Sequence, residues 1–286
     1  MNENKYIGIF DSGFGGLSVL KHAKTFMPNE NFIYMADSKN APFGLKSIEE
    51  LKVIASGIVE KLLTYDIKEI IIACGTMSTN LYDYLAIKYP DVHFLGTYPD
   101  FEHILKSGLE VTHNSIHANI NDGMSIKRKT LKILIISTLA TTKSKYMKDK
   151  ITKYNQLFNI YAEPADQIVK YVENDELDSF SCKSYLGDLF SSYKDSDYLV
   201  LGCTHFPFAE EQIRRCIGDK VKIIDGCEVT AKKAYDYLMQ NSLLNDNDAD
   251  GITKILDTTI DDKRKEIYNK LLGINNTKNN IEFLNI

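Results

Sequence analysis

The sequence has no tryptophan and only six prolines among its 286 residues. It also lacks an apolar run of about 18 residues, so we expect no transmembrane helix. The net charge of −5 gives no electrostatic reason to expect nucleic-acid binding. The first residues lack the pattern of a secretory signal peptide. We therefore expect a cytoplasmic protein that has neither a membrane nor a nucleic acid as its partner.

Cysteines and histidines do not form the spacings of common metal or disulfide sites. The five cysteines, at positions 74, 182, 203, 216 and 227, are odd in number and include no C-x-x-C pair. We therefore predict free thiols rather than a zinc site or a disulfide framework. His113 and His117 have the i, i+4 spacing of metal ligands on a helix, but a third ligand is missing and a solvated helix is preferred. Residues 241–253 resemble a calcium loop without its final glutamate, so an acidic surface loop is predicted.

What the chain does contain is an alternation of short apolar runs with helical patterns, which indicates an α/β fold. Its length suffices for one large or two modest domains. Helices are predicted after Asp11 and over residues 47–64 and 207–217, and the tail from residue 254 is expected to add a helix and an edge strand. Strands are predicted over residues 6–10, 31–35, 69–73, 93–96, 132–137, 198–202 and 221–224.

Two cysteines follow apolar runs directly, and each is followed closely by a threonine. Cys74 ends the run 70–73, and Cys203 ends the run 198–202. Because a residue just past a buried parallel strand faces the ligand crevice, both thiols are predicted to face one pocket. Two opposed thiols suit a reaction that removes a proton from one face of a carbon and returns one to the other. His205 can relay a proton to Cys203, whereas inert packing is the alternative interpretation for a lone buried cysteine.

Two loops near the N-terminus carry a functional and a structural interpretation. Glycines 13, 15 and 16 let backbone approach a ligand closely, and the start of the following helix presents free N–H groups to an anion. Ser18 occupies the place of the last glycine in G-x-G-x-x-G, so this is not a dinucleotide motif. The alternative is a tight turn that uses Asp11 or Ser12 as an N-cap. For residues 34–44, a surface turn is the simpler interpretation.

Four segments together resemble the motifs of the glutamate racemases, in the family's order and at its approximate spacing. The segments are residues 11–17, 42–44, 73–76 and 201–207. Weaker similarity extends through residues 137–144, 172–173, 224–225 and 257–259. The resemblance therefore covers nearly the whole chain.

The resemblance implies a cofactor-independent racemase made of two pseudo-symmetric α/β domains, each with a parallel sheet, and an active site in the cleft between them. Residues 1–98 plus 208–286 would form the first domain, and residues 99–207 the second. Cys74 and Cys203 would be the acid/base pair, with Asp11 assisting Cys74. His205 and Glu173 would assist Cys203. The residues expected to contact the substrate are Ser12, Pro42, Phe43, Gly44, Gly75, Thr76 and Thr204.

The activity that the resemblance implies is the interconversion of L- and D-glutamate, without a metal, for peptidoglycan synthesis. The chemistry is demanding because an amino-acid Cα–H is a very weak acid, so a base and a stabilised carbanion are needed. An ordinary thiol, with a pKa of about 8.5, must be tuned by its neighbours for this work. One thiolate and one thiol are needed together, which different environments can supply.

Two positions depart from the family's usual pattern. Gly75 stands where asparagine is usual, and Phe43 stands where tyrosine is usual. Each change removes a hydrogen-bonding group, at a typical cost of about 1–3 kcal/mol. A racemase of aspartate or another amino acid, or a catalytically weak homologue that binds an amino acid and regulates a partner, therefore stays open. The sequence also leaves the oligomeric state open, a homodimer included.

Overall fold

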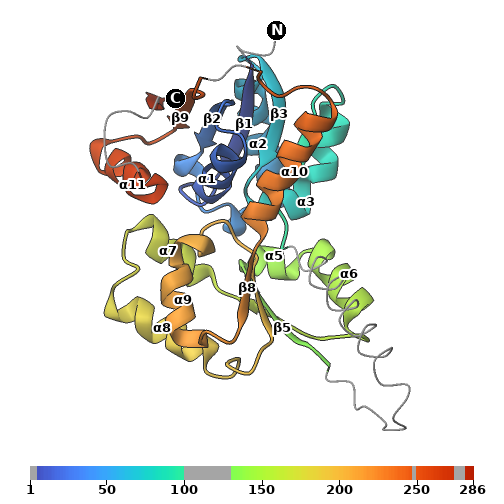
Figure 1. Ribbon diagram of the computed structural model, residues 1–286, viewed down its shortest axis with the longest axis vertical. Coiled ribbons are helices and arrows are strands. Elements are labelled where there is room, and N and C mark those ends of the chain that lie inside the picture. Colours follow the sequence, from blue (N-terminus) through green and yellow to red (C-terminus); the bar gives the residue numbers. More distant parts are fainter. Residues whose placement is uncertain (1–4, 100–129, 247–248, 274–280) are drawn as a thin grey trace.

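The structure, a computed structural model, describes residues 5–99, 130–246, 249–273 and 281–286. Its strands form two parallel sheets that lie in separate lobes, the upper and lower halves of Figure 1. The six-stranded sheet has the order β10-β9-β2-β1-β3-β4, and the four-stranded sheet has the order β6-β5-β7-β8. Every strand pairing in both sheets is parallel. The predicted fold class is therefore confirmed.

The first lobe is built on the six-stranded sheet with helices on both faces. One face is covered by α1, α10 and α11 and the other by α2 and α3, and each face has its own apolar core. The interior strands are buried on both faces, as in β2, where all six residues are buried. The elements of this lobe are β1 (Tyr6–Asp11), α1 (Leu17–Phe26), β2 (Asn31–Ala36), η1 (Ser38–Asn40), η2 (Phe43–Leu45), α2 (Ile48–Leu62), β3 (Ile67–Ile72), α3 (Gly75–Lys88), β4 (Phe94–Gly96), α10 (Gly226–Gln240), β9 (Thr253–Asp257), α11 (Asp262–Leu272) and β10 (Ile281–Asn285).

The second lobe is built on the four-stranded sheet. Its larger core lies between the sheet and α7, α8 and α9, and a smaller core lies under α6. Its elements are β5 (Lys132–Ser137), α5 (Leu139–Lys143), α6 (Lys145–Tyr154), β6 (Asn159–Pro164), α7 (Asp166–Glu173), α8 (Phe180–Phe190), β7 (Tyr198–Leu201), η3 (Phe206–Ala209), α9 (Glu210–Ile217) and β8 (Lys222–Asp225).

All the strands predicted from apolar runs are present, with ends shifted by at most a few residues. The C-terminal tail forms the expected helix, α11, and the expected edge strand, β10. It also contributes β9, which lies inside the sheet between β10 and β2 and was not predicted separately. β6 was missed because it is a partly exposed edge strand without a continuous apolar run.

The chain does not return to the first lobe where the sequence placed the boundary. β8 pairs with β7 in the four-stranded sheet, and α9 packs against α8. Residues 210–225 therefore lie with the second lobe, although the predicted boundary at residue 208 assigned them to the first. Periodicity identifies a strand but not which of two sheets it joins. We propose that the second crossing lies where β8 ends and α10 begins, since α10 packs on α1.

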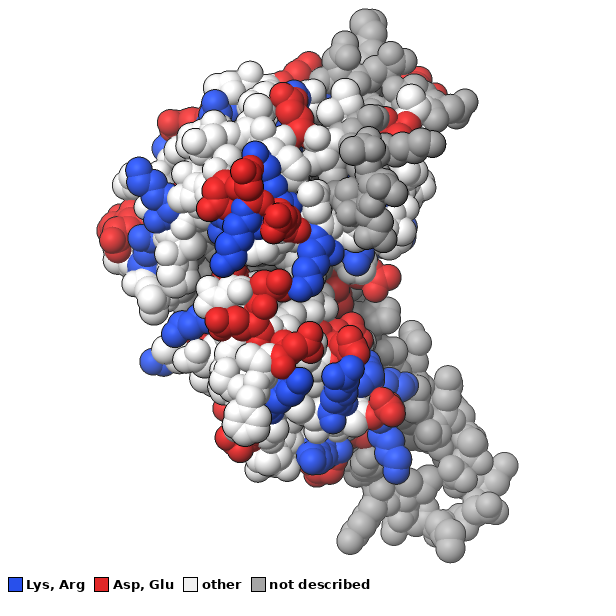
Figure 2. Space-filling view, turned by 90° about the vertical axis from the view of Figure 1, so that its left-hand side faces the viewer, with Lys and Arg blue, Asp and Glu red and all other residues white. Residues whose placement is uncertain are grey.

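Three sequence predictions concern segments away from the cleft. The described part of residues 241–252 contains no helix or strand, in agreement with the predicted loop. His113 and His117 lie outside the described residues. No helix in the described ranges is long and apolar enough to cross a membrane. On the face seen in Figure 2, basic and acidic side chains are intermingled over both lobes.

Candidate active site

A cavity of about 330 Å³ lies between the two lobes. Every residue predicted for the site lines it except Glu173, which lies behind His205. The lining from the first lobe comprises Asp11, Ser12, Pro42, Phe43, Gly44, Leu45, Cys74, Gly75 and Thr76. The lining from the second lobe comprises Thr138, Leu139, Thr141, Asp166, Val169, Lys170, Gly202, Cys203, Thr204 and His205.

Strand ends bring these residues together. β3 ends at Ile72, and Cys74 is the N-cap residue of α3. β7 ends at Leu201, and Cys203 follows in the loop before η3. The carboxyl ends of both parallel sheets thus contribute to one cleft, which is where α/β sheets bind ligands. The two thiols come from different lobes and line the same cavity, as the strand-end pattern predicted.

Cys74 lies in a buried, negatively charged environment. Burial and then the nearby Asp11 carboxylate raise the pKa of Cys74 well above its ordinary value, although backbone N–H groups of Met77 and Thr76 act against this. Burial likewise raises the pKa of Asp11. Asp11 Oδ1 accepts the N–H of Ser12 at 2.6 Å, and Asp11 Oδ2 accepts the hydroxyl of Thr204 at 2.8 Å. Burial and the Asp11 carboxylate thus both favour the neutral thiol at Cys74.

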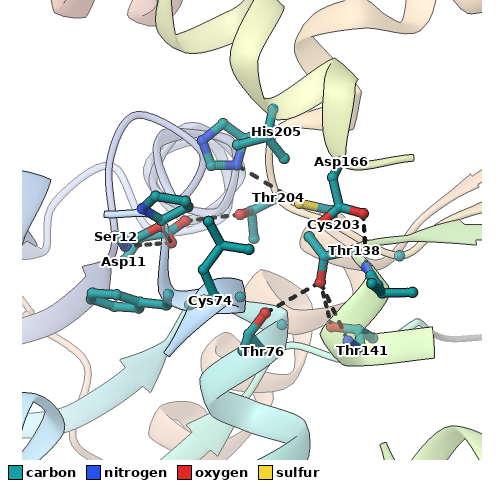
Figure 3. A pocket seen from close by; sticks show the side chains of 18 of the residues that line it. Asp11, Ser12, Cys74, Thr76, Thr138, Thr141, Asp166, Cys203, Thr204 and His205 are labelled. Atoms are coloured by element: carbon teal, nitrogen blue, oxygen red, sulfur yellow. Dashed lines mark hydrogen bonds between the residues drawn. The ribbon is translucent and has the colours of Figure 1, made fainter. Parts of the chain in front are cut away.

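Cys203 lies beside a cation instead. Its sulfur is 3.7 Å from His205 Nδ1, and His205 Nε2 is 2.7 Å from Glu173 Oε1. Burial lowers the pKa of His205, but its contacts with Cys203 and Glu173 outweigh this and raise the pKa well above its ordinary value. A basic imidazole is therefore held beside the Cys203 sulfur. Figure 3 shows the dashed line from the His205 ring to the Cys203 sulfur, with Cys203 and Asp11 on opposite sides of the view.

The glycines after β1 make room for protein side chains from the other lobe. A Cβ at Gly13 would overlap the Glu173 carboxylate, and one at Gly15 would overlap His205 and Thr204. The backbone N–H of Phe14 donates to Glu173 Oε1 at 2.7 Å. The loop therefore does bind a carboxylate with a backbone N–H, as its pattern suggested, and this carboxylate belongs to the protein itself.

Curated relatives resemble the chain over nearly its full length. The glutamate racemase of Clostridium botulinum (strain Alaska E43) is 35% identical over 272 residues, which are 94% of this chain and 98% of that protein. The glutamate racemase of Clostridium novyi is 35% identical over 273 residues, or 94% and 97% of the two chains. The chain belongs to the glutamate racemase family. A scan against protein-family models found no match.

Solved structures of the family share the fold. The glutamate racemase of Francisella tularensis in complex with D-glutamate is 26% identical, has a TM-score of 0.76, and is matched over 99% of this chain and 98% of that one. The Bacillus anthracis glutamate racemase RacE1 has a TM-score of 0.78 at 23% identity, over 99% and 98% of the two chains. The predicted family and its two-domain fold are thus confirmed.

Several residues of this family member's cleft were not predicted as site residues. Thr138 follows β5, as Cys74 follows β3, and its Oγ1 lies 3.2 Å from Thr76 Oγ1. Asp166 Oδ2 accepts the N–H of Leu139 at 2.9 Å. Among the described residues that line the cavity, Lys170 is the one lysine or arginine. The strand-end rule could have found Thr138, whereas no sequence pattern indicated which face of α7 meets the cleft.

The two departures from the family pattern both lie in the cavity wall. Phe43 is almost completely buried. At Gly75, an added Cβ would meet Gly202 O at 3.4 Å and Thr141 Oγ1 at 3.8 Å, which are ordinary contacts. A Cβ at position 75 would therefore fit without a clash, and glycine leaves its volume to the cavity.

Proposed function

We propose that this enzyme interconverts L- and D-glutamate by a two-base reaction in which Cys74 and Cys203 act on opposite faces of the α-carbon. The observation that carries the proposal is that thiols from two different lobes line one cavity. The glutamate racemases of the clostridia, at 35% identity over most of the chain, support the choice of substrate. The Francisella tularensis relative, described with bound D-glutamate, supports a small-molecule substrate.

In the resting enzyme, the different environments of the two thiols give one the role of base and the other the role of acid. The Cys203 thiolate takes the α-proton, and the electron pair of the broken Cα–H bond moves into the substrate's carboxylate as an enolate-like charge. The Cys74 thiol then gives its proton to the opposite face, which leaves Cys74 as a thiolate and Cys203 as a thiol. Proton exchange through Asp11 and His205 restores the starting state, and the reverse reaction exchanges the two roles.

We assign substrate binding to the polar groups between the thiols. Ser12, Thr76 and Thr204 supply hydroxyls, while Pro42, Phe43, Gly44 and Gly75 shape the wall. Lys170 supplies a positive charge for the second carboxylate of a dicarboxylic amino acid. Backbone N–H groups at the start of α3 stabilise negative charge near Cys74.

The direct test is circular-dichroism detection of L- to D-glutamate conversion by purified protein, with EDTA present and no cofactor added. Aspartate is assayed in parallel. Conversion of glutamate at a higher kcat/KM than aspartate is expected. Failure to convert glutamate under any of these conditions would contradict the proposal.

The space at Gly75 favours a second candidate, which is a racemase of another amino acid. Because the position contributes no side chain, a substrate bulkier than glutamate has room beside Thr141. A panel of longer amino acids in the same assay separates the candidates, since a higher kcat/KM for one of them would replace glutamate as the substrate. A supply of D-glutamate for peptidoglycan, a cytoplasmic location and a homodimer stay predictions.

A further inference from the structure

Glu173 is held from three directions at once. It extends from α7 in the second lobe, and its Oε1 contacts His205 Nε2 at 2.7 Å and the Phe14 N–H at 2.7 Å. Its other oxygen, Oε2, lies 3.8 Å from Arg264 Nη1. Phe14 and Arg264 both belong to the first lobe. The carboxylate that contacts His205 is therefore held largely by the lobe opposite to its own.

Arg264 is itself fixed in place. Its Nε donates to Asp257 Oδ2 at 2.8 Å, and its Nη2 donates to Ser38 Oγ at 2.6 Å. The guanidinium carbon lies 4.1 Å from the centroid of the Phe14 ring. Asp257 is fully buried and also accepts the hydroxyl of Tyr268 at 2.7 Å. A planar guanidinium held at several points presents Nη1 to Glu173 in a defined direction.

We propose that Arg264 is a positioning residue of the racemase, which holds Glu173 against His205 and so keeps the imidazolium beside Cys203. The inference rests on the proposed role of Cys203 in catalysis. Arg264 contacts neither the cavity nor either thiol among the described contacts, so its effect passes through Glu173. The charges alternate along Asp257, Arg264, Glu173 and His205, so each charged group has a neighbour of opposite sign.

Electrostatics supports this chain of contacts. Burial alone would raise the pKa of Glu173, but His205, the Phe14 N–H and Arg264 together lower it. Without Arg264, Oε2 loses its charged partner and the carboxylate is freer to turn away from His205. The other titratable groups that interact with Glu173 or His205 are Asp11 from β1, Tyr34 from β2, and Cys203. Asp257 and Tyr268 act on Arg264.

The test compares Arg264→Met and Arg264→Lys with the unmodified enzyme and with Arg215→Met. Arg215 is an exposed arginine on α9 that pairs with Glu211, so it controls for loss of one guanidinium. The rate of Cys203 alkylation by iodoacetamide is followed against pH by peptide mapping, with Cys74 as the internal reference. We expect Arg264→Met to slow Cys203 alkylation roughly 10-fold at pH 7 and to move its profile to higher pH, because less imidazolium stabilises the thiolate. Arg264→Lys should recover part of the loss, and Arg215→Met should show none.

A second arm separates positioning from general support of the fold. In a Glu173→Gln background, Arg264→Met should cause no further change in the Cys203 profile, because the two residues act in series. A lower melting temperature with an unmoved Cys203 profile would overturn the proposal, and so would full additivity of the two substitutions. The alkylation assay needs no substrate. An unmodified enzyme that racemises no glutamate would therefore contradict the proposed function without deciding the role of Arg264.

Discussion

The two sides of the cleft resemble each other in backbone and differ in charge. Cys74 and Cys203 each follow a parallel strand, and each has a threonine close behind it. Cys74, however, is buried beside a carboxylate, whereas Cys203 lies beside an imidazole whose pKa is raised well above its ordinary value. The comparison teaches that repetition of a local pattern places two equivalent nucleophiles, while their neighbours differ: a carboxylate disfavours ionisation of Cys74, and a basic imidazole lies beside Cys203.

The two sides also share one feature, since each is completed by the opposite lobe. Asp11 of the first lobe accepts the hydroxyl of Thr204, and Glu173 of the second lobe accepts the N–H of Phe14. On each side, therefore, a carboxylate near the thiol is held by a contact from the opposite lobe. The approach of the lobes assembles both environments together.

The largest expected effect comes from removing either thiol. Because neither side can do the work of the other, Cys74→Ala and Cys203→Ala should each lower kcat/KM for glutamate by about 10²- to 10⁴-fold, the range typical of acid–base groups. Circular dichroism measures the loss. Cys216→Ala, a half-buried cysteine outside the cavity, is the matched control and should keep full activity. Full activity in either of the other two variants would end the two-base account.

A methyl group at Gly15 should damage the Cys203 side selectively. The added Cβ overlaps His205 and Thr204, and overpacking of this kind costs about 1–3 kcal/mol. If the same free energy is lost from transition-state binding, kcat/KM for Gly15→Ala falls by up to about 100-fold. Gly57→Ala is the matched control, because nothing lies within 4 Å of its Cβ, and in a helix it should raise stability by roughly 0.5–1 kcal/mol. Equal activity of the two variants would remove the steric role given to the glycine loop.

Glu173→Gln should bring the pKa of His205 closer to that of an ordinary histidine. His205 loses a contact that raises its pKa, so the alkaline limb of kcat/KM should move to lower pH, with a roughly 10-fold loss at pH 8.

The same substitution should lower the free energy of unfolding in a defined pH range. The raised pKa of His205 contributes stability that is fully present below pH 6.5, the ordinary pKa of histidine, and is lost as the pH rises through the raised pKa. The lowered pKa of Glu173 contributes stability that is fully present above pH 4.5, the ordinary pKa of glutamate, and is lost as the pH falls through the lowered pKa. The loss of stability should thus be largest between those two values, and a loss confined to pH above 8 would contradict this account.

The smallest expected effect concerns the Cys74 side of the wall. Gly75→Asn should raise kcat/KM for glutamate about 5-fold, which corresponds to roughly 1 kcal/mol for a recovered hydrogen bond. A Cβ at this position meets its neighbours only at ordinary contact distances. Phe43→Tyr, alone and in combination, shows whether the missing hydroxyl adds to the effect. If every variant loses activity on glutamate, the pocket is shaped for another substrate.

Much of the fold and the site could be predicted because both depend on local patterns. Buried parallel strands such as β2 are continuous apolar runs, and the residues just past them, such as Cys74 and Cys203, lie at the cleft. β8 was found as a strand but assigned to the wrong side of the domain boundary, because partner choice depends on packing between distant segments. Lys170 and Arg264 were missed for the same reason. Their roles follow from the faces that α7 and α11 turn toward the cleft and toward Glu173, which no local pattern encodes.

The most direct test of the central claim is the fate of the α-hydrogen when the enzyme converts L-glutamate in D₂O. With one thiol on each face, the new α-hydrogen of the product comes from a thiol in exchange with solvent. We predict that D-glutamate formed early carries deuterium at Cα, while the remaining L-glutamate keeps its protium. Product that retains protium from the start, or equal early labelling of both enantiomers, would show that a single group serves both faces and would contradict the account.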